Sequence, residues 1–66
     1  MMEIRLNGEK KISNAETLMD LVLEQGFDPS SLIAEVNFTI IPQEAWKALS
    51  IRETDTIELL SFVGGG

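Results

Sequence analysis

Few residue types in this sequence could do chemistry, and the most common catalytic ones are missing. The chain has 66 residues with no histidine and no cysteine, so it lacks the usual general base near neutral pH and the Cys/His ligands of zinc and iron–sulfur sites. Its eleven Asp and Glu residues are scattered. No glycine-rich loop precedes a helix to hold phosphate, and no serine lies in a nucleophile elbow. We therefore do not expect an independent enzyme.

The printed sequence ends in SFVGGG, and its last carboxylate is a different kind of reactive group. A terminal carboxylate has an ordinary pKa of about 3.3–3.7, so it is ionised at neutral pH and can attack the α-phosphate of ATP to form an acyl-adenylate. Because glycine has no Cβ, Gly64, Gly65 and Gly66 could pass through a narrow passage into the active site of a partner. The sequence thus predicts a domain over residues 1–63 and a flexible tail over residues 64–66. The alternative is a frayed end with no role.

The charge balance indicates the kind of partner. The net charge is −6, which disfavours a nucleic acid and favours a protein with a positive surface. No apolar stretch is long enough to cross a bilayer, and the first residues lack the layout of a signal peptide. We expect a cytoplasmic monomer that binds neither nucleic acid nor membrane.

The first element is predicted to be a β-hairpin. Met2, Ile4 and Leu6 alternate with polar residues, as in a half-buried strand. Asn7-Gly8 is a strong signal for a tight turn, and residues 9–13 would return as a polar edge strand.

A helix is predicted to follow. Ser13 and Glu16 have the spacing of a capping box, with Asn14 as an alternative cap, and Gly26 stands where the helix would end. The expected core-facing residues repeat at helical spacing: Ala15, Leu18, Met19, Leu21, Val22 and Leu23. Three acidic residues would line the solvent side as a row: Glu16, Asp20 and Glu24.

The rest of the chain predicts three more strands. LIAEVN reads as a strand with Leu32, Ala34 and Val36 on one face, and TII as a short strand ended by Pro42. PQEAWKAL is long enough for a helical turn with proline in its first position. A polar turn, RETD, then precedes the final strand, TIELLSFV. Trp46 is expected to pack under the helical turn and Asn37 to hydrogen-bond in a turn, whereas Phe38 has no predicted place.

The order of these elements predicts an α+β fold. One main helix, a short helical turn and a mixed sheet of four to five strands form the β-grasp, or ubiquitin-like, arrangement. The helix would cross over on one sheet face. The final strand would run beside the first in the sheet centre and point the glycines off the sheet edge.

The final strand also predicts a docking surface. Successive side chains of a strand alternate between faces, so Ile57, Leu59 and Ser61 point one way, and Glu58, Leu60 and Phe62 the other. One of these faces must meet the helix. The other would expose Leu60 and Phe62 beside the tail. The expected partner-binding residues are Leu60, Phe62, Val63, Gly64 and Gly65.

Several segments carry a resemblance to a known family: EVNFTIIPQEAW, RETDTIEL and the terminal diglycine, with MEIRLNGE and AETLMDLV in the same order. Asn37, Pro42, Trp46 and Asp55 also fall in the family's order. The chain resembles the ThiS family, the sulfur carriers of thiamin thiazole biosynthesis, over its whole length.

The resemblance implies a reaction cycle. An E1-like adenylating enzyme of the ThiF type would activate the Gly66 carboxylate with ATP. A sulfur-donating enzyme would supply sulfur for a thiocarboxylate, which would pass to a thiazole synthase of the ThiG type. The chain would then be a protein cosubstrate, not an enzyme, and would hold no cofactor or metal of its own.

Two departures from the family bear on which partner is recognised. The family usually has Asp-Gly-Asp where this chain has Glu53-Thr54-Asp55, and small or polar residues where it has Phe38-Thr39. The alternatives are a MoaD-like carrier for molybdopterin, a carrier for another sulfur-transfer route, and a ubiquitin-like binding module whose tail is inert.

Overall fold

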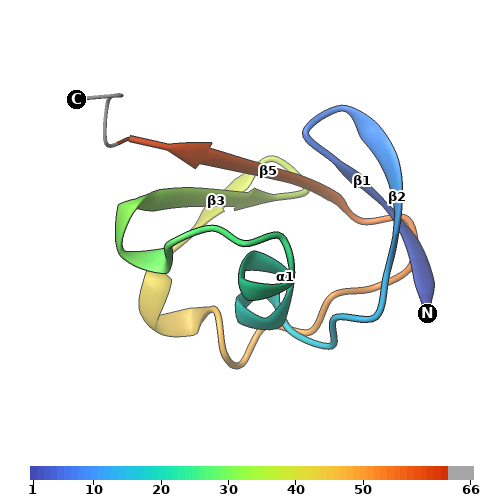
Figure 1. The fold of residues 1–66 in the computed structure, drawn as a ribbon, viewed down its shortest axis with the longest axis horizontal. Coiled ribbons are helices and arrows are strands. Elements are labelled where there is room, and N and C mark those ends of the chain that lie inside the picture. Colours follow the sequence, from blue (N-terminus) through green and yellow to red (C-terminus); the bar gives the residue numbers. More distant parts are fainter. Residues whose placement is uncertain (63–66) are drawn as a thin grey trace.

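The polar and apolar alternation of the strands produces one mixed sheet with a helix on one face. The computed structural model describes residues 1–62. Its strands are β1 (Met2–Leu6), β2 (Glu9–Ser13), β3 (Leu32–Val36), β4 (Thr39–Ile41) and β5 (Thr56–Ser61). They form a five-stranded sheet in the order β2-β1-β5-β3-β4 (Figure 1). The predicted β-grasp architecture is confirmed.

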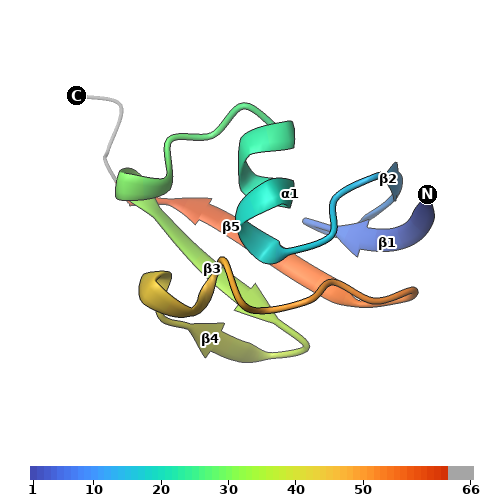
Figure 2. The ribbon, with the colours of Figure 1, turned by 90° about the horizontal axis from the view of Figure 1, so that it is seen from below.

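The helical elements lie together on one side of this sheet. They are α1 (Leu18–Glu24) and two 3-10 turns, η1 (Pro29–Ser31) and η2 (Gln43–Ala45). Figure 2 shows α1 packed across β5 and β3, with η2 beside β4. The predicted helical turn after β4 is confirmed, but Pro42 precedes it as its N-cap and is not its first residue. In the part of the chain that the structure describes, no helix is long and apolar enough to span a membrane.

The first hairpin forms as predicted. Asn7 and Gly8 have φ angles of 51° and 84°, and positive φ at both central residues defines a type I′ turn. The antiparallel register runs from Met2 opposite Ser13 to Leu6 opposite Glu9, so β2 is an edge strand. Ile4 and Leu6 are buried.

The helix begins later than predicted. Thr17 is the N-cap: its Oγ1 accepts a hydrogen bond from the Asp20 amide (3.1 Å), and Asp20 Oδ2 accepts one from the Thr17 amide (3.3 Å). The predicted cap at Ser13 or Asn14 is wrong, because Ser13 belongs to β2. The helix ends as predicted, with Gly26 at a φ of 84° just after it.

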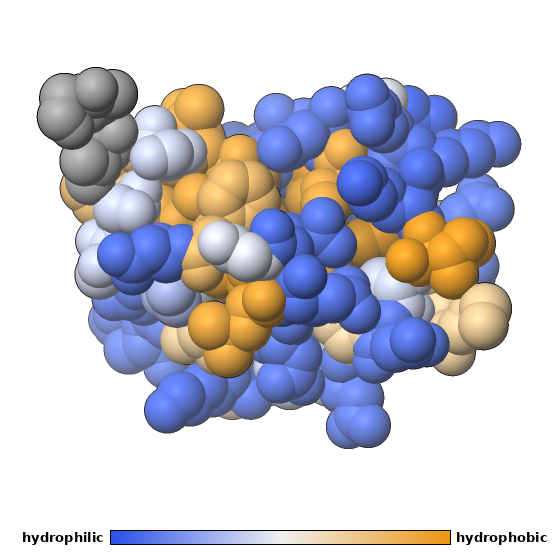
Figure 3. Space-filling view, viewed as in Figure 1, coloured by the Kyte–Doolittle hydropathy of each residue, from blue (hydrophilic) through white to orange (hydrophobic). Residues whose placement is uncertain are grey.

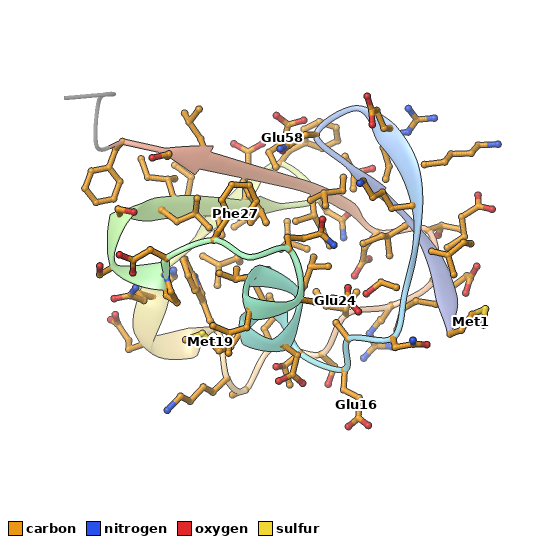
Figure 4. All side chains as sticks on the ribbon, viewed as in Figure 1. Met1, Glu16, Met19, Glu24, Phe27 and Glu58 are labelled. Atoms are coloured by element: carbon orange, nitrogen blue, oxygen red, sulfur yellow. The ribbon has the colours of Figure 1, made fainter. Side chains whose placement is uncertain are left out.

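The predicted acidic row on the helix is confirmed only in part: all three residues are exposed, but Glu16 does not lie on the helix. Glu16 lies before the helix, and the Asp20 carboxylate accepts a hydrogen bond from the N-cap amide. Glu24 accepts hydrogen bonds from the Ser13 hydroxyl (2.7 Å) and the Asn14 amide (3.2 Å). Figure 4 shows Glu16 pointing away from the molecule and Glu24 on the side of α1 that faces β2. Glu24 therefore ties the end of the helix to the first hairpin.

The core lies between α1 and the sheet. It comprises Ile4, Leu6, Ala15, Leu18, Leu21, Val22, Leu32, Ala34, Val36, Trp46, Ile51, Ile57 and Leu59. Trp46 is buried as predicted, and its Nε1–H donates to the Ile41 carbonyl (2.8 Å). Met19 packs against the core. Leu23 was predicted there but is exposed, because it is turned about 100° around the helix from the buried Val22.

The last strand occupies the centre of the sheet. β5 runs parallel to β1 and antiparallel to β3. Asn7 Oδ1 accepts from the Leu59 amide (2.8 Å). On the other side, Asn37 Oδ1 accepts from the Thr56 amide (3.0 Å), and Asn37 Nδ2 donates to Asp55 Oδ1 (3.0 Å). The predicted hydrogen-bonding role of Asn37 is confirmed, and β5 is fixed on both sides.

Candidate functional site

Side chains along β5 alternate between buried and exposed. Ile57 and Leu59 are buried against the helix, whereas Leu60 and Phe62 are 64% and 57% exposed. The expected exposure of both residues is confirmed. Leu60 thus lies on the outer face of β5, and Phe62 is exposed just after the strand ends.

Loop contacts position the last described residue. The Phe62 amide donates to the Ser31 carbonyl at 3.1 Å, and Ser31 is the last residue of η1. Asp28 caps this turn through hydrogen bonds from the Ser30 amide (3.0 Å) and the Ser30 hydroxyl (2.8 Å). These hydrogen bonds lower the pKa of Asp28 from its ordinary value of 3.8, and the bond from the amide contributes more than the bond from the hydroxyl. The capped turn therefore fixes where β5 ends.

Leu60 borders a groove. Ile33 lies opposite Leu60 in the β3–β5 register and is partly exposed. The groove has a volume of about 420 Å³ and is lined by Asn7, Ile33, Glu35, Ile40, Glu58, Leu59 and Leu60. Figure 3, viewed with α1 in front of the sheet, shows apolar surface on that side where Figure 4 labels Phe27, and this view does not look into the groove. Figure 4 shows Glu58 on the sheet face away from α1.

The structure brings some of the predicted site residues together. Leu60 lies on the outer face of β5, and Phe62 is exposed just after the strand ends. Val63, Gly64, Gly65 and Gly66 lie outside the described residues, so the flexible tail and the Gly66 carboxylate remain predictions. The site also includes residues that the sequence did not single out: Ile33, Ile40 and Ser31. An apolar residue at the outward position of LIAEVN was the available signal for Ile33.

The described residues of the groove are suited to binding. Within residues 1–62, no three His, Cys, Asp or Glu side chains come together in a way that could hold a metal ion. The groove contributes apolar side chains and two carboxylates, Glu35 and Glu58. Such a surface can dock a protein and hold the end of the chain in position.

A helix held by a mixed five-stranded sheet, whose central strand leads directly to the end of the sequence, defines a ubiquitin-like β-grasp protein. The model of the ThiS family matches residues 3–66. The chain therefore belongs to the ThiS family.

Individual relatives agree with this assignment. The chain is 32% identical over 65 residues to the sulfur carrier protein ThiS of Bacillus subtilis, covering 96% of this chain and 98% of that protein. It is 35% identical over 66 residues to a thiazole synthase of Magnetococcus marinus, covering 98% of this chain but 20% of that protein. The chain thus spans about a fifth of the length of that synthase. The crystal structure of the thiamine biosynthesis protein ThiS of Geobacter metallireducens matches with a TM-score of 0.79 and 26% identity, covering 98% of this chain and 100% of that one.

Proposed function

We propose that this chain is a sulfur carrier whose Gly66 carboxylate is converted to a thiocarboxylate that supplies the sulfur of a thiazole. A carboxylate oxygen attacks the α-phosphorus of ATP, and pyrophosphate leaves. A hydrosulfide equivalent then attacks the acyl carbon of the adenylate, AMP leaves and a thiocarboxylate remains. The chain is consumed and regenerated as a cosubstrate, and the chemistry is performed by its partners.

The observation that carries the proposal is the placement of β5. The strand is fixed at the sheet centre, and Leu60 and Phe62 are displayed beside the residues that would react. Exposed apolar side chains of this size are typical of a docking surface. Membership of the ThiS family and the similarity to a protein named sulfur carrier support the same role.

The proposed partners are three proteins. An E1-like adenylyltransferase of the ThiF type supplies the ATP site, a sulfur-donating enzyme supplies the sulfur, and a thiazole synthase of the ThiG type receives it. Similarity to proteins named thiazole synthase favours the thiazole route over a molybdopterin route. We propose a cytoplasmic monomer that meets these enzymes one at a time.

The test is the intact mass of the chain. After incubation with a ThiF-type enzyme, ATP and hydrosulfide, we expect a mass gain equal to the exchange of one oxygen for one sulfur. A variant lacking Gly66 should show no gain. An unchanged mass for the parent chain, in a reaction in which the same enzyme modifies its own carrier, would contradict the proposal.

Docking is tested separately. Phe62→Asp replaces an exposed aromatic side chain with a charge, so we expect adenylation to fall by about tenfold or more because an exposed apolar anchor is lost. The melting temperature should stay close to that of the parent chain, since the side chain is outside the core. An unfolded variant would instead assign Phe62 to the core.

A further inference from the structure

The second hairpin turn carries a residue that the fold does not explain. Asn37 and Phe38 join β3 to β4 with φ angles of 50° and 71°, which makes a type I′ turn. The second position of such a turn favours glycine, since positive φ is unfavourable for residues with a Cβ. Phe38 is also 83% exposed. This side chain therefore strains the backbone and contributes almost nothing to the core.

Phe38 continues a surface that begins at the end of the chain. The register places Leu60 opposite Ile33, Glu58 opposite Glu35, and Glu35 opposite Ile40. These five residues line the groove on the outer face of the sheet. Along the chain, Phe38 lies in the turn at one end of this row and Phe62 follows β5 at the other end, and both are exposed. We call the set the outer strip: Phe62, Leu60, Ile33, Glu58, Glu35, Ile40 and Phe38. From Thr56 to Phe62 a strand rises about 3.3 Å per residue, so the strip is about 20 Å long.

The strip is apolar at both ends and acidic in the middle. Glu35 and Glu58 are directly opposite each other, and like charges at such positions destabilise a sheet. They lie in the groove with the apolar side chains of Ile33, Ile40 and Leu60. A cation placed between the two carboxylates would relieve the repulsion, and an arginine could bond both.

We propose that the adenylating partner binds the whole outer strip, with an apolar pocket for Phe38 and an arginine or lysine between Glu35 and Glu58. The inference rests on the proposed function, since that enzyme must hold the chain while its end reacts. A second copy of this chain is a poor occupant, because its net charge of −6 and its own carboxylates would repel. Two anchors about 20 Å apart would fix the rotation of the carrier, which a single anchor at Phe62 would not.

Substitutions in the outer strip should affect binding and stability in opposite directions. Phe38→Gly removes the anchor and relieves the positive φ, so the variant should melt at a higher temperature yet bind more weakly. Glu58→Gln removes the repulsion between the carboxylates, so it should also leave the fold at least as stable while weakening binding. A residue with only a structural role would not give these opposite signs.

The experiment measures binding of the parent chain and its variants to the purified ThiF-type enzyme by calorimetry without ATP, together with thermal melting of each chain. We expect Phe38→Gly to weaken binding by about tenfold or more, and Glu58→Gln to weaken it less and to make its salt dependence shallower. Leu23→Ser and Glu16→Gln are matched controls, because they change an exposed leucine and an exposed glutamate outside the strip. Both should bind like the parent chain.

The outcomes distinguish the two proposals. If the parent chain binds and is adenylated but Phe38→Gly binds equally well, the role of Phe38 is overturned and the carrier function stands. If Glu58→Gln binds equally well with the same salt dependence, the cation between the carboxylates is overturned. If the parent chain neither binds nor gains sulfur, the carrier function itself fails and this inference fails with it. A variant lacking Gly66 should still bind, since the strip is intact.

Discussion

The two asparagine turns of this molecule have the same geometry and different second residues. Asn7-Gly8 and Asn37-Phe38 both adopt positive φ at both positions. Each asparagine side chain also accepts a hydrogen bond from the backbone of β5, one from Leu59 and the other from Thr56. Glycine at the second position of the first turn follows the preference of the turn, whereas phenylalanine in the second opposes it. The fold therefore explains the glycine in the first turn, whereas the phenylalanine in the second turn needs another explanation.

The largest effect on stability is expected from Asn37→Ala. The substitution removes the hydrogen bonds to Asp55 Oδ1 and from the Thr56 amide and places alanine at a φ of 50°. We expect a loss of about 2–3 kcal/mol in the free energy of unfolding, measured by urea denaturation. Asn7→Ala loses one such bond and should cost less. Equal losses for the two variants would show that the turns do not differ in how they hold β5.

Gly8→Phe puts the aromatic residue into the first turn. A Cβ at Gly8 would have no atom within 4 Å, so the cost comes from its φ of 84° and not from a clash. We expect the unfolding free energy to fall by about 1–2 kcal/mol. Binding to the adenylating enzyme should be unchanged, because Gly8 lies outside the outer strip. A stable Gly8→Phe variant would remove the argument that Phe38 strains its turn.

The double variant, Gly8→Phe with Phe38→Gly, moves the phenylalanine from the second turn to the first. β1 and β3 flank β5 on opposite sides and are about 10 Å apart, so the two changes should be nearly additive. We expect a stability within about 0.5 kcal/mol of the parent chain, with weak binding to the enzyme. Parent-like binding would mean that the position of the phenylalanine is unimportant.

The smallest effect is expected at the other end of β5, where Asp28 caps η1. Because its folded pKa is lowered, the carboxylate stabilises the protein above its unfolded pKa of about 3.8, and this contribution is lost as the pH falls through the folded pKa. Asp28→Ala should thus be less stable than the parent chain near neutral pH, and this difference in stability should be smaller at an acidic pH well below 3.8. Denaturation curves at both pH values measure it, and a difference independent of pH would contradict the role of the charge.

The strands and the first turn could be predicted because their signals are local. Alternating Met2, Ile4 and Leu6 and the Asn7-Gly8 pair determine a hairpin with little help from the rest of the chain. The exposed Leu60 and Phe62 followed from the same alternation once one face of β5 was assigned to the helix.

The helix start was predicted wrongly, because Ser13 and Glu16 have the spacing of a capping box but the observed cap is Thr17, which was not among the predicted caps. The position of the cap depends on distant backbone contacts. The Ile51 amide donates to the Glu16 carbonyl, and the Leu18 amide donates to the Leu49 carbonyl. Residues 49–51 thus hold the chain extended up to Thr17, and the helix begins after it. The outer strip was missed for a similar reason, because its composition depends on which strands are neighbours in space.

The central position of β5 has a consequence for biosynthesis. This strand is translated after the other four, yet it alone joins the pair β2-β1 to the pair β3-β4. A nascent chain that stops before Thr56 therefore has two separate hairpins and no continuous sheet. Such a chain also lacks Glu58, Leu60 and Phe62, so its outer strip is incomplete.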